Sequence, residues 1–182
     1  GYPNVGKSTL LSTISAARPK IANYPFTTKE PVLGVVESGY RNFVVADIPG
    51  LIEGAHRGLG LGHEFLRHIE RTRVLVHVVD GSSADPVADY AQVNKELALF
   101  NPALAEKPQI LAVNKLDLPD VRSRQDQLRA ELAKLKAPLF FISAATGEGV
   151  GSLLDKVAET LRLLAPPVEE KKEEELVVLR PQ

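Results

Sequence analysis

A glycine-rich segment followed by lysine and serine stands at the start of the chain. Its glycines allow backbone N–H groups to turn inward around an anion, the lysine ammonium reaches phosphate oxygens, and the serine hydroxyl is a ligand type that Mg²⁺ uses. A chance glycine-rich turn before a helix is the alternative, and the later motifs disfavour it. The pattern predicts phosphate binding by nine consecutive residues: Gly1, Tyr2, Pro3, Asn4, Val5, Gly6, Lys7, Ser8 and Thr9.

A second motif, Asp47-Ile48-Pro49-Gly50, follows an apolar run that ends at Asp47. Phosphate-binding α/β proteins place an acidic residue here that holds Mg²⁺ through water, and the backbone N–H of Gly50 would reach a γ-phosphate. Taken alone, the tetrapeptide is more typical of a turn. Behind a phosphate-binding loop and a strand pair, it is a candidate γ-phosphate sensor.

A third motif, Asn114-Lys115-Leu116-Asp117, follows the apolar run 110–113. The Asp117 carboxylate can accept hydrogen bonds from both guanine N1–H and the exocyclic amino group, a pair of donors that adenine lacks. Asn114 would contact the N7/O6 side of the base or brace the neighbouring loops, and the Lys115 stem would cover a ring face. The motif predicts GTP or GDP as the ligand and disfavours an ATPase.

A short segment, Ser143-Ala144-Ala145, follows the apolar run 139–142 and would supply a backbone amide for guanine O6. By itself this tripeptide carries little information. All four motifs nevertheless occur in the order expected of a GTPase, each at the predicted end of a strand, where open α/β sheets bind ligands.

The pattern of apolar residues predicts elements that position these motifs. Strand-like runs alternate with helical periods, which favours an α/β fold, specifically a P-loop NTPase G domain whose mostly parallel sheet is flanked by helices. The strand that should lead into the phosphate-binding loop is expected upstream of Gly1. The predicted helices are 7–17, 65–72, 87–100, 122–136 and 150–164. The predicted strands are 32–38, 43–47, 74–79, 110–113 and 139–142, with a hairpin turn at 39–42.

Length and composition limit the class of protein. A chain of 182 residues with 44% hydrophobic composition suits one domain, and 22 basic against 23 acidic residues exclude a strongly basic nucleic-acid binder. No cysteine is present, which excludes disulfides and thiolate zinc sites. No apolar run reaches the roughly 18 residues of a membrane span, and we expect a cytoplasmic protein. We predict a G domain over 1–165 and a charged linker over 166–182 that leads to a further C-terminal region.

The motif set resembles the Obg family of GTPases, over almost the whole predicted domain. The resemblance rests on residues 1–11, on the loop 23–28, and above all on the continuous segment 47–72. It implies Mg²⁺-dependent binding and slow hydrolysis of GTP. The family pattern also places switch I residues Phe26, Thr27, Thr28, Lys29 and Glu30 at the nucleotide, with Thr28 as the Mg²⁺ ligand beside Ser8 and with Thr27 as an open alternative.

The resemblance further implies a role in large ribosomal subunit assembly and in the stress response. The expected partners are the large ribosomal subunit and guanosine tetraphosphate, and the protein is expected to be a monomer. The resemblance also implies that an N-terminal domain of the parent protein lies outside this chain. A non-catalytic, GTP-gated scaffold and a factor similar to the developmentally regulated GTP-binding proteins are the alternatives.

We assign no catalytic residue from the sequence. Leu51 follows the second motif where Ras-like GTPases place a glutamine that orients the attacking water, which predicts slow intrinsic turnover. Related GTPases without that glutamine use potassium together with an asparagine in the phosphate-binding loop. Asn4 is therefore a candidate ligand for K⁺, weighed evenly against bracing the loop through backbone hydrogen bonds.

Overall fold

Two three-stranded sheets form the framework of the chain in the computed structural model, which describes residues 1–21, 32–39, 41–47 and 70–164. One sheet is antiparallel, in the order β1-β2-β3, and the other is parallel, in the order β4-β5-β6. The predicted α/β fold with a parallel sheet is confirmed in β4–β6, and the predicted hairpin accounts for antiparallel β2 and β3. The strands are β1 Lys20–Ile21, β2 Val32–Ser38, β3 Arg41–Ala46, β4 Leu75–Asp80, β5 Gln109–Asn114 and β6 Leu139–Phe141.

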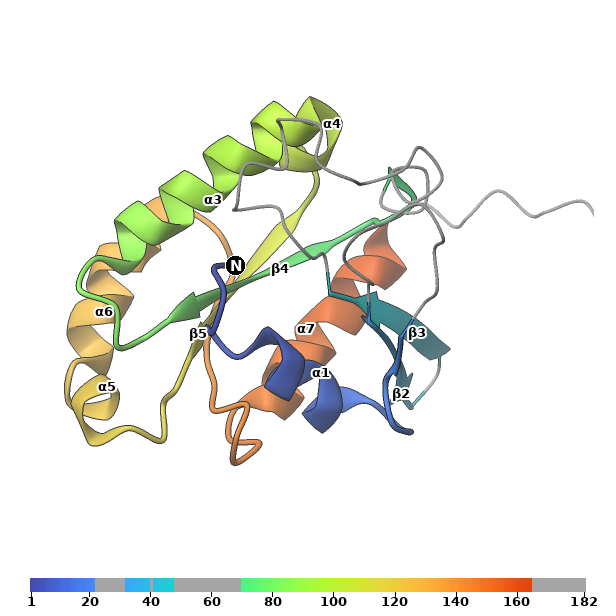
Figure 1. Ribbon diagram of the computed structural model, residues 1–182, viewed down its shortest axis with the longest axis horizontal. Coiled ribbons are helices and arrows are strands. Elements are labelled where there is room, and N and C mark those ends of the chain that lie inside the picture. Colours follow the sequence, from blue (N-terminus) through green and yellow to red (C-terminus); the bar gives the residue numbers. More distant parts are fainter. Residues whose placement is uncertain (22–31, 40, 48–69, 165–182) are drawn as a thin grey trace, which may run out of the picture.

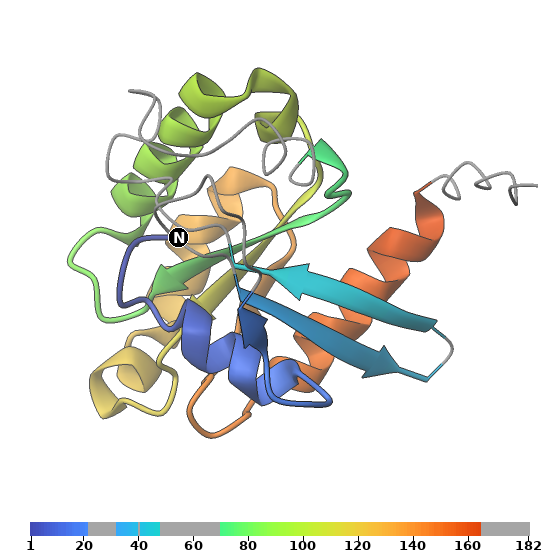
Figure 2. The same ribbon diagram turned by 45° about the vertical axis from the view of Figure 1, so that its right-hand side comes forward.

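Helices cover both faces of the parallel sheet (Figures 1 and 2). Side chains alternate along β5: Ile110 and Ala112 pack with α1 and α7, and Leu111 and Val113 pack with α5 and α6. This two-sided burial explains the unbroken apolar runs of the sequence. The helices are α1 Lys7–Ile14, α3 Pro86–Phe100, α4 Pro102–Ala105, α5 Pro119–Ser123, α6 Gln125–Leu132 and α7 Val150–Leu163, with a 3₁₀ turn at Ala133–Leu135.

Two predicted helix boundaries are wrong. The first helix ends at Ile14 instead of residue 17, because both the hydroxyl and the N–H of Ser15 donate to the carbonyl of Leu11 while Ser15 itself is extended. The predicted helix 122–136 is divided into α5, α6 and the 3₁₀ turn. Arg124 leaves helical geometry between α5 and α6, with φ −96° and ψ 3°.

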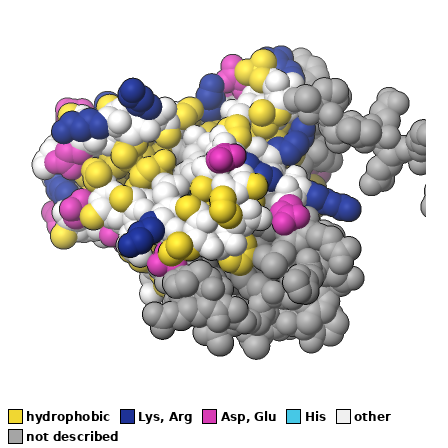
Figure 3. Space-filling view, turned by 90° about the horizontal axis from the view of Figure 1, so that it is seen from above, with side chains coloured by type: hydrophobic (Ala, Val, Ile, Leu, Met, Phe, Trp, Pro, Cys, Tyr) yellow, Lys and Arg dark blue, Asp and Glu magenta, His cyan; other side chains and the backbone are white. Residues whose placement is uncertain are grey.

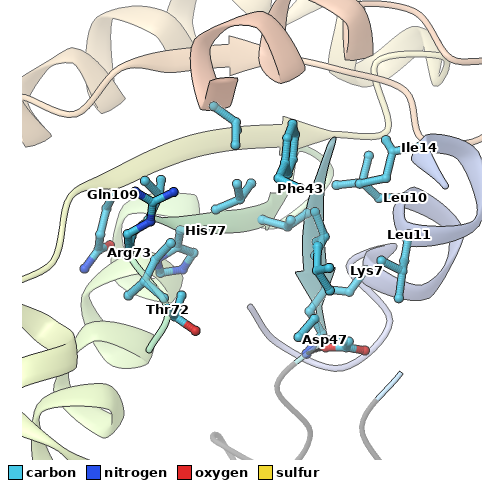
Figure 4. Close-up of a pocket in the computed structure, with 18 of the residues that line it drawn as sticks. Lys7, Leu10, Leu11, Ile14, Phe43, Asp47, Thr72, Arg73, His77 and Gln109 are labelled. Carbon is cyan, nitrogen blue, oxygen red and sulfur yellow. Dashed lines mark ion pairs between the residues drawn. The ribbon is translucent and has the colours of Figure 1, made fainter. Parts of the chain in front are cut away.

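A cavity of about 580 Å³ separates the two sheets (Figure 4). Residues of β3 line one side and residues of β4 line the other, and within the described chain neither facing edge has a strand partner. Three buried polar atoms without a hydrogen-bond partner among the described residues belong to residues of this lining: Asp47 Oδ1, His77 Nε2 and Gln109 Oε1. The slot between β3 and β4 is therefore bounded by two open strand edges and lined by polar atoms without a hydrogen-bond partner among the described residues.

The surface carries both signs of charge. On the face seen in Figure 3, basic and acidic side chains are interspersed with apolar ones and do not gather into one basic patch. None of the helices in the described part of the chain is long and apolar enough to cross a membrane.

Candidate nucleotide-binding site

The glycine-rich segment forms a loop that turns into α1. Asn4 has φ 63° and Gly6 has φ 104°, so two backbone units lie in the left-handed region that favours glycine. A Cβ at Gly6 would lie 2.1 Å from Asn114 Nδ2, which leaves no room for a side chain there. The Ser8 and Thr9 side chains are exposed at the beginning of α1, where the free N–H groups of a helix favour an anion.

Lys7 and Asp47 face each other at one end of the cavity (Figure 4). The Lys7 ammonium donates to the carbonyl of Gly1 at 2.9 Å and lies 3.8 Å from Asp47 Oδ1. That oxygen is buried and accepts no hydrogen bond from a described residue. A buried carboxylate oxygen without a donor is costly, so this atom calls for a cation or a bound water.

Asn114 joins the phosphate-binding loop to the loop after β6. Its amide group donates to the carbonyl of Val5 at 2.8 Å, and its Oδ1 accepts from the N–H of Ala144 at 2.8 Å. The side chain is 3% exposed. Of the two roles left open for Asn114, the structure shows the bracing of neighbouring loops.

Lys115 is held by an acidic residue from the neighbouring strand. The strand register pairs Asp80 with Asn114, and the Lys115 ammonium donates to Asp80 Oδ2 at 2.5 Å. Burial raises the pKa of Asp80, but hydrogen bonds from Lys115 and Ser82 outweigh it and bring that pKa below its ordinary value. The backbone of Lys115 has φ 71°. The direction of the Lys115 side chain is therefore set by the loop conformation as well as by the ion pair with Asp80.

Asp117 lies at the surface beside a buried serine. Its Oδ1 accepts from the Ser143 hydroxyl at 2.7 Å, and that hydroxyl in turn accepts from the N–H of Thr146 at 3.1 Å. Because the Thr146 N–H occupies one side of the Ser143 hydroxyl oxygen, the hydroxyl proton points toward Asp117. Asp117 is thus oriented while most of its acceptor capacity stays free for a ligand.

The segment 143–145 after β6 offers one backbone amide to a ligand. The N–H of Ala144 is occupied by Asn114, whereas the N–H of Ala145 donates to no other residue in the described ranges, and Ala145 is exposed. The Thr13 hydroxyl donates to the carbonyl of Ala144 at 2.7 Å and ties α1 to the same loop. Ala145 is therefore the member of the predicted tripeptide best suited to reach guanine O6.

Several predicted site residues lie outside the described chain: Phe26, Thr27, Thr28, Lys29, Glu30, Ile48, Pro49, Gly50 and Leu51. Sequence reasoning missed Asp80, Thr13 and the ion pair of Arg122 with Glu148. Asp80 carried a usable signal, because it ends its strand at the position that pairs with Asn114. The other contacts join residues far apart in the chain, and no local pattern marks them.

A glycine-rich loop before α1, the buried Asp47 oxygen after β3, and Asp117 and Ala145 after the parallel strands β5 and β6 together have the arrangement of a P-loop guanine-nucleotide-binding domain. A family model described as "50S ribosome-binding GTPase" matches residues 1–115. The chain belongs to this family of GTP hydrolases.

The relatives narrow the assignment within that family. The chain is 59% identical over 179 residues to GTPase Obg of Roseiflexus castenholzii and 54% identical over 183 residues to GTPase Obg of Dehalococcoides mccartyi. These matches cover 97% and 100% of this chain, but only 41% and 43% of the length of the two relatives. The predicted resemblance to the Obg family is confirmed.

The fold also has solved counterparts. The G domain of the T. maritima FeoB iron transporter superposes with a TM-score of 0.61 at 25% identity, covering 87% of this chain and 93% of that domain. The cytosolic domain of L. pneumophila FeoB gives a TM-score of 0.61 at 20% identity over 88% of this chain and 61% of that one. These matches agree with the predicted G-domain fold.

Proposed function

We propose that this domain binds GTP with Mg²⁺, hydrolyses it slowly, and acts as a nucleotide-gated switch in large ribosomal subunit assembly and stress response. The observation that carries the proposal is the double hydrogen bond of Asn114, which holds the phosphate-binding loop and the guanine loop in one unit. The first experiment is a competition between GTP and ATP for the fluorescent ligand N-methylanthraniloyl-GDP. Equal displacement by ATP would count against the proposal.

The residues present fit a bound Mg²⁺. Asp47 Oδ1 is buried without a donor, and oxygen ligands of this type are those that Mg²⁺ prefers while it keeps several waters. Ser8 would hold the ion directly and Asp47 through water, and Thr28 or Thr27 would join them from switch I. Bound there, Mg²⁺ would neutralise charge on the β- and γ-phosphates. Among the described residues no three acidic or histidine side chains form a metal cluster of their own, which suits an ion bound with phosphates.

Each loop has its own part in the proposed reaction. Lys7 would leave the Gly1 carbonyl and reach the β- and γ-phosphates, while the loop N–H groups orient them. Asp117 would accept from the guanine edge and the Ala145 N–H would donate to O6. Residues 26–30 and 48–50 would close over the γ-phosphate.

We further propose that turnover without a partner is slow and that Asn4 helps to hold K⁺. The leucine at position 51, where a glutamine would orient water, supports the first part, and the exposed position of Asn4 in the phosphate-binding loop supports the second. Phosphate release would be compared in K⁺ and Na⁺ at equal ionic strength, for the parent protein and Asn4→Ala. Equal acceleration of both proteins would remove Asn4 from the cation site.

The ribosomal role is supported by the description of the matching family and by the Obg names of the relatives. Phosphate release would be measured with and without large ribosomal subunits. Acceleration by the subunit supports the switch, whereas binding to the subunit without any phosphate release in its presence would favour the GTP-gated scaffold. Guanosine tetraphosphate binding, a monomeric state and a cytoplasmic location stay predictions, as do domain limits at 165 and 166.

We also propose that a further strand, from chain preceding Gly1, enters the slot between β3 and β4. The two open edges support it, as do the buried atoms His77 Nε2 and Gln109 Oε1, which have no hydrogen-bond partner among the described residues. Hydrogen exchange would be compared between this chain and a version that includes the upstream segment. Equal exchange of the β3 and β4 amides in both would contradict the proposal.

A further inference from the structure

The two loops that would recognise the base are joined by an ion pair at their outer rim. Arg122 lies in α5, which follows the Asn114–Asp117 segment, and Glu148 lies in the loop after β6. Arg122 Nη1 donates to Glu148 Oε1 at 3.1 Å and Nη2 donates to Oε2 at 2.6 Å. Two parallel contacts of this kind fix the plane of the guanidinium.

Asp117 is joined to Glu148 through Ser143, and its charge acts on both members of the ion pair. The pKa of Arg122 is raised mainly by its hydrogen bond with Glu148 and further by the charge of Asp117. Arg122 lowers the pKa of Glu148, and the Asp117 charge opposes that effect. Ser143 links the two acids, since its hydroxyl donates to Asp117 and its N–H donates to the Glu148 carbonyl at 2.9 Å.

In this arrangement the carboxylates of Asp117 and Glu148 compete for the guanidinium of Arg122. A guanidinium is charged at every physiological pH, and its planar set of donors matches a carboxylate. An Arg122 without its partner would therefore turn to Asp117 and occupy the oxygens that the guanine edge needs. Because half of each side chain is exposed, at 51% and 46%, the pair can exchange partners without disturbing the core.

We propose that Glu148 is a positioning residue for base recognition, which holds Arg122 away from Asp117 and so keeps the Asp117 carboxylate available to guanine. This inference rests on the proposed role of Asp117. A pair that only clamps the loops would behave differently, because either partner would then be equally necessary.

The experiment measures the affinity of N-methylanthraniloyl-GDP for four proteins: the parent, Glu148→Ala, Arg122→Ala and the double variant. Glu148→Ala should weaken binding roughly two- to fivefold, the range that one exposed ion pair can supply. Arg122→Ala should bind as well as the parent, and the double variant should recover the parent affinity. Equal losses in both single variants with no recovery in the double variant would overturn the inference in favour of a clamp.

A second arm repeats the comparison in Asp117→Asn with the fluorescent xanthosine diphosphate analogue. Residue 117 then carries no charge to attract Arg122, so Glu148→Ala should have no effect; a persisting loss would overturn the inference. Glu159→Ala, which breaks the similar exposed pair with Lys156 at 2.7 Å on α7, is the matched control and should leave affinity unchanged. If Asp117→Asn keeps its guanine preference, the base role of Asp117 itself fails, and this inference fails with it. A shifted preference in Asp117→Asn, together with an unchanged N-methylanthraniloyl-GDP affinity of Glu148→Ala when Asp117 is intact, rejects this inference alone.

Discussion

Replacing Asn114 by alanine should destabilise the fold and weaken nucleotide binding together. The change removes two hydrogen bonds of 2.8 Å and leaves the Val5 carbonyl and the Ala144 N–H without those partners. Both residues are buried, at 4% and 1% exposure. An orphaned buried polar group costs about 1–3 kcal/mol, so the free energy of unfolding should fall by roughly 2–6 kcal/mol.

Urea unfolding at 25 °C measures the loss of stability, and N-methylanthraniloyl-GDP fluorescence in buffer measures the loss of affinity. Asn94→Ala is the matched control, because Asn94 also makes two side-chain hydrogen bonds, with Tyr90 and Gln109, but on α3, away from the loops. It should lower stability less and leave the affinity of the folded protein intact. If the two variants lose the same stability, or if Asn114→Ala binds nucleotide like the parent, the bracing role is refuted.

Three further predictions test other parts of the site and core. Asp117→Asn should weaken guanine nucleotides and favour xanthine nucleotides, because the amide can donate to the xanthine carbonyl; an unchanged preference in a competition assay would exclude the base role. Lys7→Ala should reduce affinity roughly ten- to a hundredfold, the value of one charge-assisted hydrogen bond, with an unchanged circular dichroism spectrum as the control for folding. Burial lowers the pKa of His77 to about 3, below its unfolded value, so the folded state resists protonation and stability falls as pH drops below about 6.5. Between pH 7.5 and 5.5 this loss should approach about 1.4 kcal/mol, and urea unfolding of His77→Gln should lack it.

Much of the fold could be predicted from the sequence, because both of its regular patterns are local. The apolar run ending at Val79 predicted a strand covered on two faces, and Gly39 with its neighbours predicted the β2–β3 hairpin; both features are present. Helix ends were less predictable, since the end of α1 depends on the Ser15 hydroxyl returning to Leu11. Sequence periodicity does not contain that choice of partner.

The residues of the site also fall into a predictable and an unpredictable group. The motif residues were identified because their types and spacing match phosphate and guanine chemistry. Their supports were not, because Asp80, Arg122 and Glu148 act through contacts between elements 26 to 35 residues apart. Asn114 belongs to both groups. Its place in the site could be predicted from the sequence, but only its hydrogen bonds with Val5 and Ala144 show that it braces the loops.

The central claim is guanine-specific hydrolysis at the loops joined by Asn114. Phosphate release from GTP and from ATP, with Mg²⁺ present and Lys7→Ala beside the parent protein, tests it most directly. We predict slow release from GTP that disappears in Lys7→Ala, and no release from ATP above background. Equal release from ATP, or release from GTP that survives in Lys7→Ala, would contradict the account.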